Sequence, residues 1–212
     1  MLFNSYIFIF TFLPLTLIGF ALFQKWGKVR AMTAWLVLCS LFFYGWWNPS
    51  YLVLLGLSVG VNFFIGKSLL TKPAKPILIG GIAFNLGLLG YFKYAGFFGS
   101  IVGLSMPDII LPLAISFFTF QQITYLVDAA KGKTAAYNFL DYCLFVTFFP
   151  QLIAGPIVHH KTMMPQFANR KIFGLTAQNL AIGLTFFAIG LFKKTVIADG
   201  IAQFSTPVFD AA

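Results

Sequence analysis

The chain has 212 residues, and its composition excludes an ordinary water-soluble enzyme. Hydrophobic residues make up 59% of it, aromatic residues 19% and charged residues only 9%, and the mean hydropathy is +0.89. Soluble domains usually carry about 25% charged residues, so this chain has too little polar surface to cover a globule in water. We therefore expect lipid to surround most of it, in an all-α, polytopic membrane helix bundle.

Charge is the second constraint on function. Lys and Arg together number 14 against five acidic residues, all of them Asp, for a net charge of +9. Because the basic residues lie between apolar runs, they indicate membrane topology and contact with anionic headgroups, and not nucleic-acid binding. The two cysteines, Cys39 and Cys143, lie inside apolar runs and are expected to pack there without forming a disulfide framework.

The apolar residues form seven runs, each predicted to be a membrane helix or part of one. In chain order these are residues 6–23, 31–47, 51–66, 77–92, 109–127, 137–158 and 177–192. The first is long enough to span a bilayer and lacks the features of a signal peptide. The second ends in aromatic residues typical of a membrane interface. The third contains Gly56 and Gly60, whose spacing permits close helix contact.

Two stretches between or after these runs are less regular. The Gly-rich stretch from residue 94 to Asp108 is expected to hold a short interfacial helix. Residues 195–212 are mixed in character, and no internal repeat is evident along the chain.

The basic residues around the first five runs favour an extracytoplasmic N-terminus. With this orientation only Lys93 lies outside, whereas the opposite orientation reverses the bias. The residues placed in the cytoplasm are Lys25, Lys28, Arg30, Lys67, Lys72, Lys75, Lys131 and Lys133.

The sixth run, residues 137–158, is predicted to be a re-entrant or broken segment. Pro150, Gly155 and Pro156 would interrupt a helix there. Broken backbone at membrane depth is tolerated only where protein or a watery cavity covers it. A simple span would place the basic residues that follow it outside, whereas a return to the cytoplasm makes the pair Lys193-Lys194 the exception. Both topologies therefore stay open at this point.

The sequence lacks the common signatures of soluble enzymes. It has no dinucleotide-binding glycine fingerprint, no phosphate-binding loop, no zinc-protease motif and no nucleophile elbow. Its five Asp residues are scattered, and its two His and two Cys do not have the spacing of a metal site. These motifs therefore predict no metal, no bound cofactor and no catalytic residue.

His159 and His160 are the only histidines and therefore the only candidate imidazole bases. Adjacent residues on a helix point about 100° apart, so both cannot face one site in the same way. They follow a Gly-Pro break and precede Lys161, a pattern typical of an interfacial basic loop. The alternatives are a site for an anionic or carbonyl group, or a catalytic role.

Gln121, Gln122 and Thr124 lie in an otherwise apolar helix. Burying amides in lipid is unfavourable unless they are paired, so we expect either hydrogen bonds between helices or the lining of a polar substrate path. Asp128 ends the same helix and is interpreted as a solvated helix end near Lys131.

Two other charged groups are interpreted as structural. Asp141 lies near the start of the sixth run, where a negative charge suits a helix N-terminus. Lys193, Lys194 and Asp199 are expected to form a charge network at the membrane surface, with the anchoring of a polar headgroup as the alternative.

Five segments, in order and spacing, resemble the membrane-bound O-acyltransferase (MBOAT) family, in particular its bacterial, alginate O-acetyltransferase-like branch. They are LFNSYIF at 2–8 with FLP at 12–14, SLFFYGW at 40–46, LPLAISFFTFQ at 111–121, FFPQLIAGPI at 148–157, and GLFKK at 190–194 with AD at 198–199. The resemblance extends over essentially the whole chain.

This resemblance implies transfer of an acyl group, with acetyl expected, from a cytoplasmic thioester to hydroxyls of an extracytoplasmic polysaccharide such as alginate. The donor substrate would be acyl-CoA or an acyl-carrier protein, and periplasmic acetylation proteins would be further partners. The location implied is the bacterial inner (plasma) membrane, with the lipid bilayer around a multi-pass bundle.

The resemblance also implies a funnel-like cavity with re-entrant helices. The polar and helix-breaking residues of the fifth and sixth runs, with the two histidines that follow the sixth, are the candidates for lining a substrate path through it. They are Gln121, Gln122, Pro150, Gln151, Gly155, Pro156, His159 and His160.

Family members are roughly twice as long as this chain and carry their catalytic His in the second half. Neither His159 nor His160 occupies that position, so the resemblance assigns no catalytic residue here. We expect residues 1–212 to be a single membrane domain, the N-terminal portion of a longer enzyme, and to be inactive alone.

Two other classes of function remain as alternatives. A transporter or flippase for an envelope precursor usually shows repeat symmetry and charged intramembrane residues. Neither is clear here, where Gln121 and Gln122 are the only strong polar pair expected within the membrane. A non-catalytic scaffold would bind an acyl-carrier protein or another envelope component through the basic loops.

Overall fold

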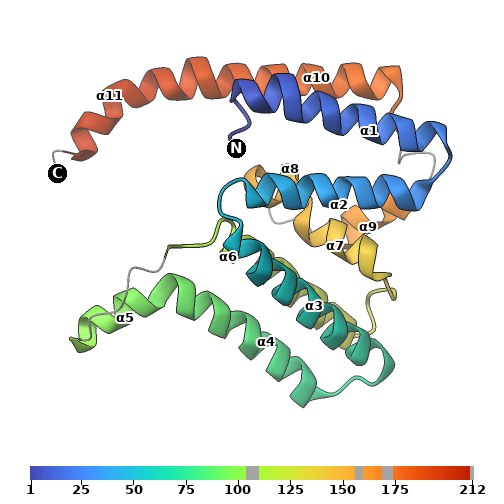
Figure 1. Cartoon of the computed structure of the whole chain (residues 1–212). Coiled ribbons are helices and arrows are strands. Elements are labelled where there is room, and N and C mark those ends of the chain that lie inside the picture. The colour runs from blue at the N-terminus through green and yellow to red at the C-terminus, as the bar shows by residue number, and fades with distance from the viewer. Residues whose placement is uncertain (104–109, 156–159, 169–173, 211–212) are drawn as a thin grey trace. The chain divides into compact units, whose positions relative to one another are not determined.

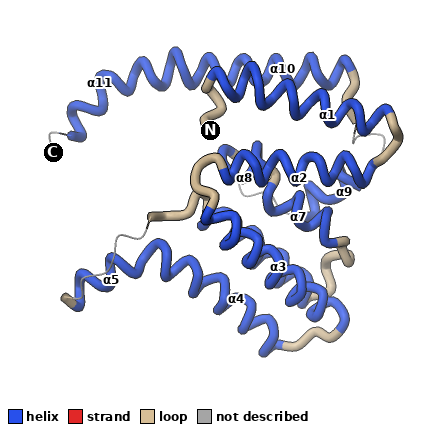
Figure 2. Tube along the Cα trace, viewed as in Figure 1, coloured by secondary structure: helices blue, strands red, loops and turns tan. Residues whose placement is uncertain are grey.

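A computed structural model describes residues 1–103, 110–155, 160–168 and 174–210 of the chain. Those residues form helices joined by turns and loops, with no strand among them (Figure 2). The predicted all-α fold is thus confirmed. The chain divides into two compact units, Met1–Lys28 with Gly174–Ala212, and Val29–Phe173. Each unit is described by itself.

The first unit consists of two helical rods. The π-helical turn η1 (Phe8–Phe12) runs into α1 (Leu13–Lys25), and α10 (Ala177–Phe192) continues through η3 (Lys193–Ala198) into α11 (Asp199–Asp210). The α1 and α10 rods lie side by side (Figure 1).

Contacts at both ends of this pair show that α1 and α10 are antiparallel. The Gln24 amide donates to the carbonyl of Leu175 at 3.2 Å and accepts from its N–H at 2.6 Å, just before α10 begins. Near the other end, the Phe8 and Phe187 rings lie 6.0 Å apart. Lys193 and Lys194 therefore lie at the opposite end of this unit from Lys25.

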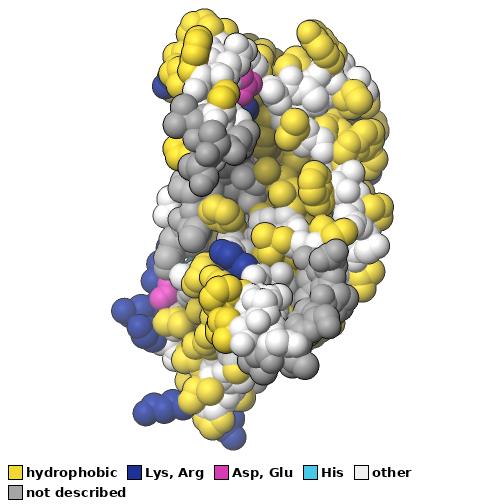
Figure 3. Space-filling model, turned by 90° about the vertical axis from the view of Figure 1, so that its left-hand side faces the viewer, with side chains coloured by type: hydrophobic (Ala, Val, Ile, Leu, Met, Phe, Trp, Pro, Cys, Tyr) yellow, Lys and Arg dark blue, Asp and Glu magenta, His cyan; other side chains and the backbone are white. Residues whose placement is uncertain are grey.

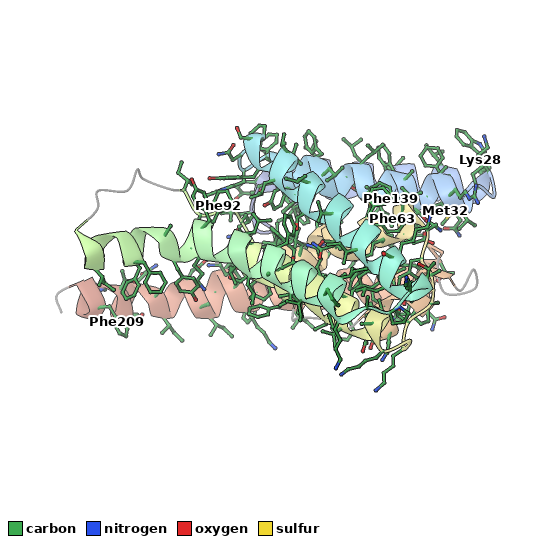
Figure 4. All side chains as sticks on the ribbon, turned by 90° about the horizontal axis from the view of Figure 1, so that it is seen from below. Lys28, Met32, Phe63, Phe92, Phe139 and Phe209 are labelled. Carbon is green, nitrogen blue, oxygen red and sulfur yellow. The ribbon has the colours of Figure 1, made fainter. Side chains whose placement is uncertain are left out.

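The second unit contains the remaining helices. They are α2 (Val29–Gly45), α3 (Ser50–Thr71), α4 (Lys75–Leu89), η2 (Gly90–Tyr94), α5 (Ala95–Val102), α6 (Ile115–Ala130), α7 (Phe139–Thr147), α8 (Phe149–Ala154) and α9 (His160–Ala168). Its core is apolar and aromatic, with Phe118, Tyr125 and Tyr142 fully buried. Phe63 of α3 and Phe139 of α7 meet at one side of it (Figure 4), with ring centroids 5.1 Å apart.

Four helical stretches are long and apolar enough to cross a membrane. They are Phe8–Lys25, Ser50–Thr71, Lys75–Ile101 and Ala177–Pro207. Hydrophobic side chains cover much of the face seen in Figure 3, and Lys and Arg gather toward its lower edge. These features identify a multi-pass membrane protein.

Two predicted elements differ from the structure. The short helix expected after Lys93 is α5, which is continuous with α4 through η2 and ends where Gly103 adopts a left-handed conformation (φ 73°). The fifth run becomes helical only at Ile115, because Pro112 and a left-handed Ala114 (φ 57°) precede the helix. The Tyr44 hydroxyl donates to the Leu113 carbonyl in this non-helical stretch at 3.0 Å.

Close helix packing occurs at glycines other than the predicted pair. A Cβ added to Gly56 or Gly60 would meet no described atom within 4 Å, so this spacing mediates no close contact in the described residues. A Cβ on Gly66 would lie 2.3 Å from the Tyr125 ring, and one on Gly81 would lie 2.8 Å from Leu126. The absence of a side chain at these two positions thus allows α6 to approach α3 and α4.

The second unit has a basic end. Helices α3 and α6 run in the same direction, since Ser58 contacts Gln122 and Gly66 contacts Tyr125 farther along both helices. The C-terminal ends of both helices therefore lie at the same end of the unit. The basic residues there are Lys67, Lys72, Lys75, Lys131 and Lys133.

Candidate functional site

The sixth apolar run is a broken helix, as predicted. Helix α7 ends at Thr147 and α8 begins at Phe149, with Phe148 (φ −52°, ψ 106°) between them. Pro150 lies in the first turn of α8, where its missing N–H leaves no helical hydrogen bond unmade. The apolar helical stretch in the sixth run, Phe139–Ile153, is shorter than each of the four candidate membrane spans.

Side chains from two other helices complete the backbone hydrogen bonds at this break. In a continuous helix the Phe149 N–H would donate to the Phe145 carbonyl. Here the Phe149 N–H donates to the Ser40 hydroxyl of α2 at 3.2 Å, and the Phe145 carbonyl accepts from the Gln121 amide of α6 at 3.0 Å. The break is therefore covered by protein on two sides, as irregular backbone at membrane depth requires.

A second group of buried polar side chains lies next to the break. The Gln122 amide donates to the Ser58 hydroxyl at 2.9 Å and accepts from the Tyr142 hydroxyl at 3.3 Å. These bonds join α6 to α3 and α7. Interhelical hydrogen bonding is thus the role the structure shows for both Gln121 and Gln122, and whether either lines a substrate path stays a prediction.

A further amide pair joins α3 to α4. Asn62 and Asn85 exchange hydrogen bonds of 2.6 and 3.2 Å, and both side chains are fully buried. The prediction that Gln121 and Gln122 are the only strong polar pair in this part of the chain is therefore wrong. The sequence does indicate this second pair, because Asn62 and Asn85 are amides within apolar runs, as Gln121 and Gln122 are.

His160 lies in the most elaborate polar cluster of the described residues. Its Nε2 is 3.0 Å from the Asp128 carboxylate, and its Nδ1 is 3.1 Å from the Tyr137 hydroxyl and 3.3 Å from that of Thr134. The Thr134 hydroxyl also donates to Tyr137 at 3.1 Å, and Lys161 pairs with Asp128 at 3.0 Å. We call these five residues the His160 cluster.

Burial divides this cluster into an inner and an outer part. The His160 side chain is fully buried, and its ring has edge-on contacts with Tyr125 and Phe145. Asp128 is also nearly buried, whereas Tyr137 and Thr134 are half-buried. Lys161 is exposed, so the outer part of the cluster consists of Lys161, Tyr137 and Thr134.

Two interpretations from the sequence are corrected by this cluster. Asp128 is not a solvated helix end, because it is buried and paired with His160 and Lys161. His160 does not lie in an exposed interfacial loop, because it is the first residue of α9 and its ring is buried. Partners that are 32 residues apart in the chain cannot be paired from local patterns, which is why sequence reasoning missed them.

The cluster also shows that the sixth run begins and ends at the same end of the second unit. Tyr137 precedes α7 and His160 follows α8, yet their polar atoms are within hydrogen-bonding distance. Residues 137 and 160 thus lie at the same end of the unit, next to the C-terminal end of α6. The chain therefore leaves this end of the unit in α7, breaks at Phe148 and is back at the same end by His160. This course favours the re-entrant topology over a simple span.

The other predicted residues have simpler environments. Gln151 and Gly155 belong to the α8 turn, and a Cβ on Gly155 would lie 2.8 Å from the Gln151 backbone. Pro156 and His159 lie outside the described residues. Cys39 and Cys143 are both free thiols, the first buried and the second half-buried.

Both charged groups that were interpreted as structural have local partners. Asp141 lies in the first turn of α7 and bonds to the helix cap Asn138, and Lys194 pairs with Asp199 across η3. Among the described residues no group of three or more His, Cys, Asp or Glu side chains is placed to hold a metal ion.

Comparison with known proteins identifies relatives along the whole chain. The membrane-bound O-acyltransferase family model matches residues 129–210. The peptidoglycan O-acetyltransferase of Helicobacter pylori is 44% identical over 100% of this chain and 47% of its own length. The probable alginate O-acetylases of Pseudomonas putida and Pseudomonas aeruginosa are each 36% identical, over 95% and 99% of this chain and 44% and 42% of their own lengths.

The chain therefore spans about half the length of the curated relatives it matches. No solved structure matches it significantly.

Proposed function

Because the chain belongs to the membrane-bound O-acyltransferase family, we propose that it forms part of an enzyme that acetylates hydroxyls of an extracytoplasmic polysaccharide. The observation that carries this proposal is the 44% identity to a peptidoglycan O-acetyltransferase along the entire chain, in the same order as the likeness to alginate O-acetylases. All these relatives are named for O-acetyl transfer to a glycan. Since this chain spans about half their length, the activity proposed is that of the complete gene product.

The proposed reaction moves an acyl group from the sulfur of a thioester to the oxygen of a sugar hydroxyl. A sugar hydroxyl attacks the carbonyl carbon of a thioester, the C–S bond breaks, and the hydroxyl proton passes to the departing thiolate. A thioester on CoA or on an acyl-carrier protein is charged and remains in the cytoplasm, whereas the polysaccharide lies outside. The two substrates must therefore meet inside the bilayer, in a protein-lined passage.

The broken segment between α7 and α8 is our candidate for part of that passage. It enters from the basic end of the second unit, and its break lies beside Ser40, about two-thirds of the way along α2. Backbone that departs from a helix at this depth is stable only against protein or a watery cavity. Pro150, Gln151 and Gly155 would then lie along the path, with Gln121 holding the break in place.

We further propose that the N-terminus is extracytoplasmic and that the bundle lies in the inner membrane. The re-entrant course supports this, because it keeps Lys161 at the same end as Lys131 and Lys133. Lys193 and Lys194 lie at the far end of α10 from Lys25, so they remain exceptions to the positive-inside rule.

Acetyl transfer by the complete gene product in membrane vesicles tests the proposed function. The donors are labelled acetyl-CoA and an acetyl-loaded acyl-carrier protein, each supplied on the cytoplasmic face, with peptidoglycan or polymannuronate as acceptor. We expect base-labile label on one of the polymers. Absence of label on both, with either donor, would contradict the proposal.

The role of the break is tested by Pro150→Ala and Gly155→Ala in the same assay. Both substitutions should lower transfer, with Pro76→Ala at the start of α4 as the matched control. Unchanged transfer in both variants would exclude the break from the substrate path.

A further inference from the structure

The His160 cluster has the connectivity of an activated hydroxyl nucleophile. A carboxylate can only accept hydrogen bonds, so the contact to Asp128 places the proton of a neutral His160 on Nε2. The lone pair is then on Nδ1, which faces the Tyr137 hydroxyl at 3.1 Å. Hydroxyl, imidazole and carboxylate in this order form the arrangement that activates a hydroxyl for attack on an acyl group.

From this arrangement we propose that Tyr137 accepts the acyl group from the thioester donor, with His160 as the base that takes its proton. The proposal rests on the proposed acyltransferase function and adds a covalent acyl-enzyme to it. Asp128 acts as a positioning residue, because it fixes the tautomer and the orientation of the imidazole. Thr134 donates a hydrogen bond to the Tyr137 oxygen and orients it.

The step is a simple acyl exchange. The Tyr137 oxygen attacks the thioester carbonyl, a C–O bond forms and the C–S bond breaks. The phenolic proton passes to Nδ1 of His160 and from there to the departing thiolate, which leaves as a free thiol. In the second half, an acceptor hydroxyl that enters from the extracytoplasmic side through the proposed passage attacks the tyrosyl ester, and its proton ends on the Tyr137 oxygen.

A tyrosyl ester is a suitable carrier for this purpose. A phenolate is a much better leaving group than the alkoxide of Ser or Thr, so the ester retains reactivity toward a sugar hydroxyl. Tyr is one of the side chains that form covalent intermediates. This favours Tyr137 over Thr134, which also lies farther from Nδ1, at 3.3 Å.

The surroundings of Tyr137 suit a thioester donor that arrives from the basic end. Tyr137 and Thr134, whose hydroxyls lie within hydrogen-bonding distance of Nδ1, are half-buried, whereas His160 is fully buried. Lys131 and Lys133, on the same connection between α6 and α7, are exposed. Their charge would attract the phosphate groups that CoA and the phosphopantetheine of a carrier protein share.

Trapping the acyl-enzyme tests this proposal. The complete gene product is incubated with labelled acetyl-CoA, or with acetyl-loaded carrier protein, without acceptor, quenched, digested and analysed by mass spectrometry. We expect an acetyl adduct on Tyr137 that hydroxylamine removes and that added acceptor discharges. Tyr137→Phe should remove the adduct and lower transfer to the acceptor by about 100-fold or more, and His160→Gln should slow loading by about 100-fold.

Tyr51→Phe is the matched control, because Tyr51 is also half-buried and its hydroxyl donates to a backbone carbonyl, that of Ile110. It should load and transfer like the unsubstituted protein. Thermal unfolding of every variant in detergent separates lost chemistry from lost structure. A folded Tyr137→Phe protein that transfers within twofold of the unsubstituted rate would overturn the proposal.

The outcomes also separate this proposal from the proposed function. Transfer to the acceptor without an adduct at Tyr137 in a single turnover overturns the acyl-enzyme alone. Neither transfer nor adduct with either donor overturns both.

Discussion

The hydroxyl of Ser40 accepts a hydrogen bond from the backbone N–H of Phe149 across 109 positions of sequence. It takes the place of the Phe145 carbonyl, which bonds instead to the Gln121 amide. One serine and one glutamine thus satisfy the two backbone groups, the Phe149 N–H and the Phe145 carbonyl, whose mutual bond is lost where α7 ends and α8 begins. Because both groups are buried, the break has a defined geometry and is not a frayed helix end.

We expect Ser40→Ala to destabilise the protein by about 1–3 kcal/mol, because the buried Phe149 N–H loses the Ser40 hydroxyl as its acceptor. The matched control is Thr33→Val in the same helix, since the Thr33 hydroxyl bonds within its own helix, to the carbonyl of Val29 one turn earlier. Thermal unfolding in detergent should show a clear loss for Ser40→Ala and little change for Thr33→Val. Equal stability of the two variants would show that the Ser40 bond contributes nothing measurable.

The paired amides of Asn62 and Asn85 predict that the effects of substituting them on stability are not additive. Asn62→Leu removes both hydrogen bonds, and of the described residues the Asn85 amide then keeps the carbonyl of Gly81 as its partner. Asn62→Leu and Asn85→Leu should each destabilise, while the double variant should be more stable than their sum predicts. Couplings of this kind within membranes average about 0.6 kcal/mol. A coupling indistinguishable from zero in a double-mutant cycle would argue against the pair as a unit.

Most helices were predictable, because long apolar runs in a chain with few charges have little choice but to be helical in lipid. Their ends were less predictable. The third run ends at Gly66 by hydropathy, yet α3 continues through Lys67 to Thr71, because a polar residue ends a membrane span without ending a helix. Helix α6, in the fifth run, starts later than hydropathy suggests, because Ala114 is left-handed.

The broken segment was predictable from Pro150 and Gly155, since both are helix breakers whose effect is local. The partners that stabilise it were not. Ser40 is one ordinary serine in an apolar helix, and only the tertiary structure brings it to Phe149. The same holds for Asp128, which looked like a helix end because its partner is 32 residues away.

Gly66 should be far more sensitive to substitution than Gly60, although both lie in α3. A Cβ at position 66 would overlap the Tyr125 ring at 2.3 Å, and Tyr125 is buried and cannot move aside easily. A Cβ at position 60 meets nothing within 4 Å. We therefore expect Gly66→Ala to cost about 1–3 kcal/mol by overpacking, and Gly60→Ala to be neutral or slightly stabilising. Thermal unfolding of the two variants measures this difference in stability. Equal melting temperatures would contradict the close packing of Gly66 against Tyr125.

The return of the sixth run to its starting end makes a direct prediction about sidedness. In a protein without its natural cysteines (Cys39→Ala, Cys143→Ala), a new cysteine is introduced at one exposed position at a time. Lys133→Cys lies before the broken segment and Thr162→Cys follows it, and both should react with an impermeant maleimide from the same face of sealed vesicles.

Lys93→Cys serves in that experiment as the control for labelling from the opposite face of the membrane. It lies about 27 Å along the helical stretch from Lys75, at 1.5 Å per residue, and so should react only from the other side. A simple span would instead place Thr162→Cys with Lys93→Cys. Because Tyr137 and His160 are within hydrogen-bonding distance, the structure requires the first result, and labelling of Thr162→Cys from the Lys93 side would be incompatible with it.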